Sequence, residues 1–268
     1  APQILEFQKK HKCKVIASTF HNEWFKNLEE YKNITFINPD IPIETYAQYK
    51  IGWFKKDGKW DANEKTHTQP NTVPLIQTIT NILDLPYKEI NKGIDFIPGK
   101  RPIKGKYICI GPRSTAGLKE WPHSNWRGLA KRLSKKGYKV VNLSYEGFVG
   151  TNIINKQKLS WEKTFNYLHH ADLFIGLGSG LSWVNWALNK KTVMINNFIP
   201  LGFEFTKKLT KIENTSVCNN CWVKKDYIFD AGDWDWCPEN KGTKDQHICH
   251  KSITVDQVYS KVLNLLDD

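Results

Sequence analysis

The segment 173–195, LFIGLGSGLSWVNWALNKKTVMI, reads as a strand, a glycine-rich turn, a helix and a second strand. Residues 173–176 and 192–195 are continuous apolar runs, which is typical of parallel strands buried on both faces. A helix over 181–188 separates the two strands. Strands alternating with helices of this length pair in parallel through right-handed crossovers. The segment therefore predicts an α/β fold with a parallel sheet.

The same alternation extends toward the N-terminus. Further strands are predicted at 107–110 and 138–143, and further helices at 125–136 and 161–169, where Ser160 is expected to be the N-cap. An amphipathic helix over 253–266 follows at the C-terminal end. We interpret residues 101–268 as a doubly wound, Rossmann-like domain of the nucleotide-binding type.

The first half of the sequence shows a weaker version of the same rhythm. Helices are predicted over 1–11 and 21–28, strands over 13–17 and 34–37, and a helix from Pro74 through Leu83. The proline-punctuated stretch 86–105 reads as a linker, so we place one domain at 1–100 and a second at 101–268. Cys13 and Cys109 lie in predicted strands and are expected to be core thiols.

Three loops at the predicted carboxyl edge of the sheet carry side chains suited to an anionic ligand. In doubly wound sheets, ligands bind beyond the carboxyl ends of the strands. Hydroxyls and a lysine suit a diphosphate, glycines before a helix let the backbone approach a ligand, and a carboxylate can hold sugar hydroxyls. The alternatives are a solvated loop, a tight turn and a lone exposed carboxylate. The candidates are Ser114, Thr115 and Lys119, with Arg113 ranked behind Lys119; Gly178, Ser179, Gly180, Leu181 and Ser182; and Glu204.

A cysteine-rich loop at 215–250 holds four of the six cysteines, namely Cys218, Cys221, Cys237 and Cys249. A C-x-x-C hook with two later thiols can complete a tetrahedral thiolate site for zinc or iron. The alternatives are two disulfides or four reduced thiols. We expect the tryptophans of the loop, at positions 222, 234 and 236, to form its local core rather than an aromatic platform for a ligand.

The composition restricts the class of protein. The 268 residues include 39 Lys and Arg against 27 Asp and Glu, a net charge of +12 that favours anionic partners such as nucleotide phosphates or nucleic acid. Because the lysines are spread along the chain, a nucleic-acid-binding protein is the weaker alternative. No apolar run approaches a membrane span, and the first residues lack a signal-peptide pattern. We therefore expect a cytoplasmic protein with reduced thiols.

Two motifs resemble a known family. The run from Thr115 to Trp126, with its Lys-x-Trp-Pro core, and the turn Gly176–Ser182 resemble the C-terminal domain of the ADP-heptose transferases of lipopolysaccharide synthesis. The pattern C-x-x-C-W, then F-x-x-G-D-W-x-W-C-P, then G-T and a final Cys resembles the metal-binding segment of the bacterial autotransporter heptosyltransferases. Together with Ser18-Thr19-Phe20 and Ile51-Gly52-Trp53-Phe54, the resemblance covers nearly the whole chain.

The resemblance implies a GT-B-like fold with two Rossmann-like domains, the first incomplete, plus a four-cysteine metal loop and a C-terminal helix. It implies transfer of a heptose from an ADP-sugar to serine hydroxyls of an acceptor protein. By similarity Lys119 contacts the donor's phosphates, the turn Gly178–Ser182 cradles the nucleotide, and the four cysteines hold a structural iron, with zinc as the alternative. A homo-oligomer is possible, and no nucleic acid is expected as a partner.

The catalytic base is not assigned. In the family an Asp of a G-D-T loop, located before the helix that opens this sequence, acts as the base, and no residues here match that loop. The base is therefore expected upstream of residue 1. A non-catalytic subunit that binds a nucleotide sugar is the main alternative to a transferase.

Overall fold

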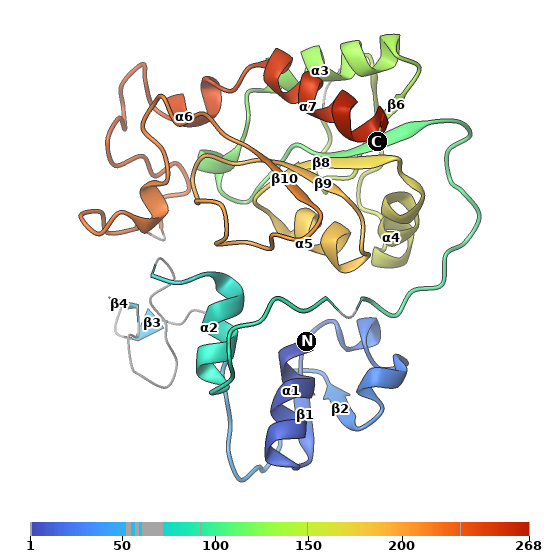
Figure 1. Ribbon diagram of the computed structural model, residues 1–268, viewed down its shortest axis with the longest axis vertical. Helices are drawn as coiled ribbons and strands as arrows, with labels where there is room; N and C mark the ends of the chain where they lie inside the picture. Colours follow the sequence, from blue (N-terminus) through green and yellow to red (C-terminus); the bar gives the residue numbers. More distant parts are fainter. Residues whose placement is uncertain are drawn as a thin grey trace. The chain divides into compact units, whose positions relative to one another are not determined.

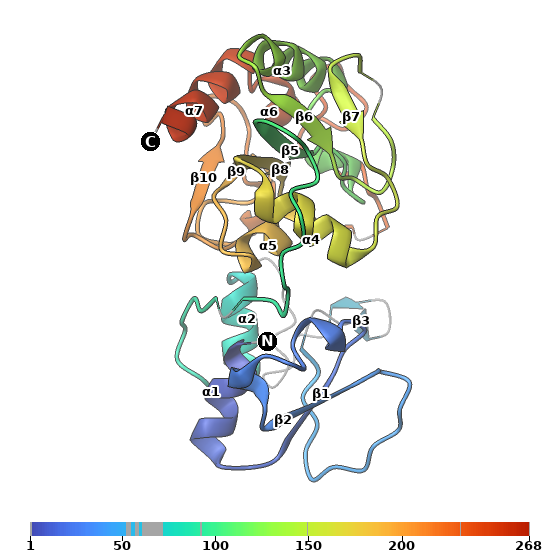
Figure 2. The same ribbon diagram turned by 90° about the vertical axis from the view of Figure 1, so that its right-hand side faces the viewer.

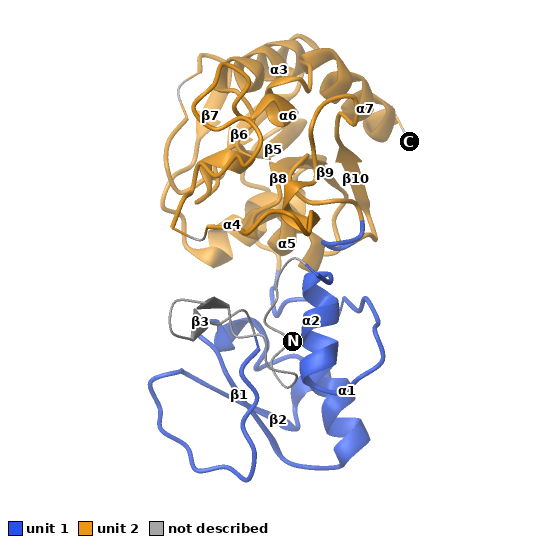
Figure 3. Ribbon diagram, turned by 90° about the vertical axis from the view of Figure 1, so that its left-hand side faces the viewer, with its two compact units in different colours: residues 1–97, 202–205 blue, residues 98–201, 206–268 orange. Residues whose placement is uncertain are grey.

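The structure, a computed structural model, describes residues 2–51, 55–56, 59–60, 72–91, 93–148, 150–230 and 232–267. The motif residues Gly52, Trp53 and Phe54 lie outside the described residues. The chain divides into two compact units, Ala1–Ile97 with Gly202–Phe205, and Pro98–Leu201 with Thr206–Asp268 (Figure 3). The predicted domain limits, 1–100 and 101–268, remain a proposal about separate domains, which this division does not test.

The described residues of the first unit form two α-helices and two small sheets. Strand β1 (Val15–Ser18) pairs in parallel with β2 (Ile34–Ile37), and β3 (Lys55–Lys56) pairs antiparallel with β4 (Lys59–Trp60). Helix α1 (Pro2–His11) contributes Leu5 to a small core with Ala17, Tyr31 and Ile34. Helix α2 (Leu75–Ile82) follows Pro74, as predicted.

Two predictions for this unit were wrong. Residues 21–28 form only a 3-10 turn, Asn22–Trp24, because Phe25 turns to pack on Tyr31 and Phe36 at ring distances of 5.8 and 5.6 Å. Tertiary packing here overrides the helical spacing. Cys13 is exposed rather than a core thiol, because α1 ends at His11 and the strand begins only at Val15.

The second unit is built on one six-stranded parallel sheet. Its strands lie in the order β10-β9-β8-β5-β6-β7, which Figure 2 shows from left to right. The four strands predicted from the sequence are confirmed, and the two outer strands, β7 and β10, were not predicted. The strands are β5 (Tyr107–Gly111), β6 (Lys139–Asn142), β7 (Ile153–Asn155), β8 (Leu173–Leu177), β9 (Thr192–Ile195) and β10 (Leu209–Ile212).

Helices cover both faces of this sheet (Figure 1). Helices α3 (His123–Lys135) and α7 (Val255–Asp267) pack together on one face, and α4 (Trp161–His170) and α5 (Gly180–Ala187) lie on the other. The Ser160 hydroxyl accepts a hydrogen bond from the Lys163 N–H, which confirms the predicted N-cap. A short helix α6 (Ile248–Lys251) ends the cysteine-rich loop. None of the described helices is long and apolar enough to cross a membrane.

The strand order fixes where a ligand site is expected. The chain runs outward from β5 to β6 and β7, then returns to the other side of β5 and continues through β8, β9 and β10. The chain therefore adds strands on one side of β5 first and on the other side from β8 onward, so the strand order reverses between β5 and β8. In doubly wound sheets the crevice outside the carboxyl ends of the two strands at such a switch point is the usual ligand site.

Candidate functional site

The loop after β5 is held in a defined shape by Glu120. One carboxylate oxygen of Glu120 accepts from the Arg113 guanidinium (3.0 Å), and the other accepts from the backbone N–H of Ser114 (3.0 Å). Arg113 is thereby engaged within its own loop, which agrees with ranking it behind Lys119. The Ser114 hydroxyl accepts from the Ala116 N–H (3.4 Å), while Thr115 is exposed at the tip. Glu120 was not predicted, because its only signal in the sequence was a carboxylate in a loop that also carries an arginine.

Lys119 connects the two loops of the switch point. Its ammonium donates a hydrogen bond to the Gly178 carbonyl oxygen (3.1 Å), in the loop after β8. The same nitrogen lies 5.9 Å from the centre of the Phe198 ring, in the loop after β9. The Lys119 ammonium is half-buried beside a carbonyl, which carries no net charge, and an aromatic face, and an ammonium in such a place can bind an anion. A phosphate oxygen is therefore a stronger partner for this ammonium than the carbonyl.

The turn between β8 and α5 offers backbone groups more than side chains. Ser179 is the N-cap of α5, and its side chain makes no capping hydrogen bond. The Gly180 Cα faces open space, since a Cβ placed there would meet no atom within 4 Å. The first N–H groups of a helix lack carbonyl partners one turn earlier and favour anions. The turn can therefore accept a phosphate close to its backbone.

Two residues of this turn have structural roles. The Ser182 hydroxyl is buried and donates to the Leu177 carbonyl oxygen (2.6 Å), so it closes the turn. Leu181 packs near Gly111, where an added Cβ would lie 3.3 Å from the leucine Cδ1. Both residues shape the turn. Of the other three, Gly180 is exposed, Ser179 is half-buried and Gly178 is buried.

Glu204 is placed differently from the other candidates. The segment Gly202–Phe205 belongs to the first compact unit, where the Phe203 carbonyl accepts from the Leu75 N–H (3.3 Å). Glu204 is also buried, at 9% exposure, so the alternative of an exposed lone carboxylate was wrong. The structure brings Lys119 and Gly178 together within the second unit, and Glu204 is not part of that arrangement.

The four cysteines of the loop 215–250 are free thiols that affect one another electrostatically. Burial, and then the other three thiols of the loop among further groups, raise the pKa of Cys249 to about 12. Burial likewise raises the pKa of Cys221 to about 11. Within the described residues, no group of three or more His, Cys, Asp or Glu side chains is close enough to hold a metal ion. The thiols are thus neighbours without forming a compact coordination shell.

Hydrogen-bond donors point at two of these sulfurs. The Asn240 side-chain amide donates to Cys218 Sγ (3.3 Å). His250 Nδ1 lies 3.3 Å from Cys249 Sγ, while its Nε2 accepts from the Asn197 N–H (3.4 Å). Because a backbone N–H can only donate, Nε2 carries no proton, and the neutral ring bears its proton on Nδ1, facing the sulfur. Such donors favour a thiolate, which is the form that binds a metal. The sequence analysis missed His250, although it directly follows Cys249.

The tryptophans of the loop follow the predicted pattern in part. Trp222 and Trp236 are buried and pack on Phe198 and Phe229, with ring distances of 4.8 to 6.0 Å. Trp234 is 51% exposed, so the prediction that it belongs to the local core of the loop was wrong. Its backbone carbonyl instead accepts from the Leu118 N–H (3.0 Å).

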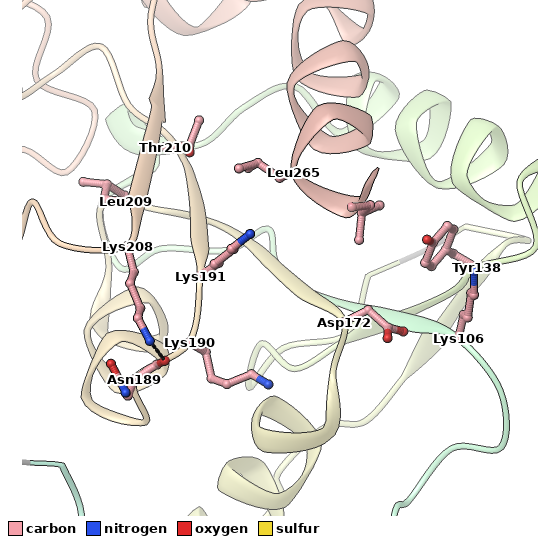
Figure 4. A pocket seen from close by; sticks show the side chains of 11 residues that line it. Lys106, Tyr138, Asp172, Asn189, Lys190, Lys191, Lys208, Leu209, Thr210 and Leu265 are labelled. Atoms are coloured by element: carbon pink, nitrogen blue, oxygen red, sulfur yellow. Dashed lines mark hydrogen bonds between the residues drawn. The ribbon is translucent and has the colours of Figure 1, made fainter. Parts of the chain in front are cut away.

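A hollow of about 690 Å³ lies at the opposite, amino edge of the sheet (Figure 4). Lys106, Lys190, Lys191 and Lys208 line it together with Asp172. Burial lowers the pKa of Lys190, whose ammonium donates to the His169 carbonyl (2.8 Å). This hollow is basic, but it lies at the amino ends of the strands, whereas ligands of doubly wound sheets bind beyond the carboxyl ends. We therefore centre the candidate site on Lys119 and the turn after β8.

Comparison with known proteins gives a consistent family. A family model described as glycosyltransferase family 9 (heptosyltransferase) matches residues 45–225. The autotransporter heptosyltransferase Aah of Escherichia coli is 31% identical, over 97% of this chain and 68% of its own length. The protein BimC of Burkholderia thailandensis, named an inactive autotransporter heptosyltransferase, is 27% identical over 95% of this chain and 62% of its own length.

Solved structures of one protein match the whole fold. TibC from enterotoxigenic E. coli H10407 is described as an iron-containing dodecameric glycosyltransferase. Its crystal structure superposes with a TM-score of 0.87 at 30% identity, covering 100% of this chain and 74% of TibC. A second TibC structure, in complex with ADP-D-β-D-heptose, gives the same TM-score at 28% identity, with 98% and 71% coverage.

Proposed function

Because the chain belongs to glycosyltransferase family 9, the heptosyltransferase family, we propose that it transfers a heptose from ADP-heptose to serine hydroxyls of an autotransporter protein. The observation that carries the proposal is the hydrogen bond from the Lys119 ammonium to the Gly178 carbonyl, which joins the loops after β5 and β8 at the switch point. The fold around this hydrogen bond matches that of TibC. A TibC structure holds ADP-heptose, and this supports the same donor for the present chain.

Each part of the site has a role in this proposal. Lys119 binds the diphosphate of the donor and stabilises the negative charge that develops as the diphosphate leaves. The backbone of Gly178, Ser179 and Gly180 approaches the same phosphates at the N-terminus of α5, while Leu181 and Ser182 maintain the turn. Ser114 and Thr115 offer hydroxyls on the neighbouring loop, and Glu204 stays a candidate for sugar contact. We do not assign the base that deprotonates the acceptor serine to any of the described residues.

We further propose that Cys218, Cys221, Cys237 and Cys249 hold a structural iron, as the iron content of TibC supports. Four soft thiolates suit iron and also zinc, the alternative metal. The donor groups of Asn240 and His250 would stabilise the bound thiolates. The iron would fix the shape of the loop, with no part in the transfer itself.

The assembly and cellular place of the protein are part of the same proposal. The dodecameric state of TibC supports a homo-oligomer here. A cytoplasmic location, O-glycosylation of an acceptor protein and a GT-B-like fold of two Rossmann-like domains, the first incomplete, agree with membership of the family.

A second candidate function is donor binding without transfer. It is favoured by one relative, BimC, which is 27% identical over 95% of this chain and is named inactive. Family membership leaves the nucleic-acid-binding hypothesis without support beyond the net charge of +12.

One experiment separates the two candidates. The purified chain, with its metal, is incubated with ADP-heptose and an autotransporter passenger fragment, and the fragment is then weighed by mass spectrometry. We expect heptose adducts on serines, which disappear when those serines are replaced by alanine. ADP binding without adducts would favour the non-catalytic function, and no binding of ADP or ADP-heptose would overturn both.

A further inference from the structure

The cysteine-rich loop, residues 215–250, contacts two of the loops at the carboxyl edge of the sheet. Its Trp234 carbonyl accepts from the N–H of Leu118, the residue before Lys119 (3.0 Å). The N–H groups of Asn220 and Trp222 donate to the carbonyls of Asn197 (2.7 Å) and Phe198 (3.3 Å). The cysteine-rich loop is thus bonded to the backbone on both sides of the Lys119 ammonium.

The side chains of the loop also hold the ring beneath that ammonium. Phe198, whose ring centre lies 5.9 Å from Lys119 Nζ, packs against Trp222 (5.4 Å), Trp236 (6.0 Å) and Phe229 (6.3 Å). Three aromatic rings of one loop therefore fix the position of the ring that faces Lys119. Such ring pairs contribute about 0.5–1.5 kcal/mol each beyond the area they bury.

Both ends of the cysteine-rich loop are hydrogen-bonded to Asn197, the residue before Phe198. The buried Asn197 side-chain amide donates to the Cys249 carbonyl (2.6 Å) and to the Asn214 carbonyl (3.1 Å), and its oxygen accepts from the Asn214 N–H (2.8 Å). Asn197 therefore joins the start and the end of the cysteine-rich loop at the carboxyl end of β9. A displacement of either end moves the segment that carries Phe198.

The contact beside Lys119 is close. A Cβ built on Gly117 would lie 2.4 Å from Asp235 Oδ1 and 3.8 Å from the Trp234 carbonyl oxygen. Only glycine permits this approach without movement of the Asp235 side chain. The backbone next to Lys119 thus rests directly on the cysteine-rich loop.

We infer that the cysteine-rich loop positions Lys119 through Phe198, with Trp222 and Trp236 as positioning residues, so that an ordered conformation of this loop sets the affinity for the donor diphosphate. The inference rests on the proposed function in one respect, namely that Lys119 binds that diphosphate. It gives the loop a role in donor binding that does not depend on any contact between the loop and the donor.

A matched pair of tryptophans tests this inference. Trp236→Ala removes a buried ring from Phe198, whereas Trp234→Ala removes an exposed side chain and keeps the carbonyl that bonds Leu118. Calorimetric titration with ADP should show at least tenfold weaker binding for Trp236→Ala and less than a twofold change for Trp234→Ala. Circular dichroism of both variants establishes that the α/β unit stays folded.

A readout without ligand keeps the inference separate from the proposed function. Hydrogen exchange of the peptide that contains the Leu118 amide should accelerate in Trp236→Ala and stay unchanged in Trp234→Ala. Faster exchange with unchanged ADP affinity would overturn the inference, and so would unchanged exchange. If the wild-type chain bound no ADP, the proposed function would fail, while the exchange result would still show whether the loop holds Lys119 in place.

Discussion

Replacement of Lys119 by alanine is expected to weaken ADP binding about 10- to 100-fold, because a hydrogen bond to a charged group contributes about 1.5–3 kcal/mol. The Lys119 ammonium joins the loops that follow β5 and β8 through its hydrogen bond to the Gly178 carbonyl, which carries no net charge. The variant loses a point charge where the donor phosphates would bind. Isothermal titration with ADP measures the change directly.

The control for this variant is a lysine at the other edge of the sheet. Lys191 lines the basic hollow at the amino ends of the strands, and Lys191→Ala should leave ADP affinity unchanged. Lys119→Arg should recover only part of the affinity, because the charge of a guanidinium is spread over a planar fork, whereas an ammonium is a compact point charge. Equal ADP affinities for wild type and Lys119→Ala would remove Lys119 from the donor site.

Replacement of Cys249 by serine is expected to release the metal and to lower thermal stability. An ion present at a thousand times its dissociation constant stabilises the folded state by about 4 kcal/mol. For a domain of this size that corresponds to a fall of about 8–16 °C in Tm. Metal analysis of the purified variant and a thermal unfolding scan give the two values.

The acidity of the thiols adds a pH dependence to this prediction. Burial keeps the pKa of Cys221 near 11 and that of Cys249 near 12, so metal binding must displace protons. The metal affinity should therefore fall as the pH falls. Cys13→Ser, at an exposed cysteine outside the loop, should change neither metal content nor Tm. Full metal content in Cys249→Ser would exclude Cys249 as a ligand.

The sheet of the second unit was largely predictable because its central strands are buried on both faces. β5, β8 and β9 are short, mainly apolar runs, which is typical of parallel strands buried on both faces. β7 and β10 are the two edge strands, and an edge strand has a neighbouring strand on one side only. β7 has three residues, and β10 contains the polar residues Thr210 and Lys211. Their sequences therefore carry too weak a signal.

The site was predictable at the level of loops and less so at the level of single contacts. The alternation of strands and helices predicts that the loops after the strands share one edge of the sheet, and the structure places the loops of Lys119 and Gly178 side by side. The pairing of Glu120 with Arg113 and the orientation of His250 toward Cys249 depend on how the loops fold. Trp234 and Trp236 differ by two positions and have opposite exposure, which spacing alone does not reveal.

Hydrogen exchange with and without ADP-heptose shows whether the donor binds at the carboxyl edge of the sheet, as we propose. We predict slower exchange in peptides that cover 113–119 and 178–182, with no change at 189–191 and 208–210. Slower exchange confined to the latter two segments, at the basic hollow of the amino edge, would contradict the account.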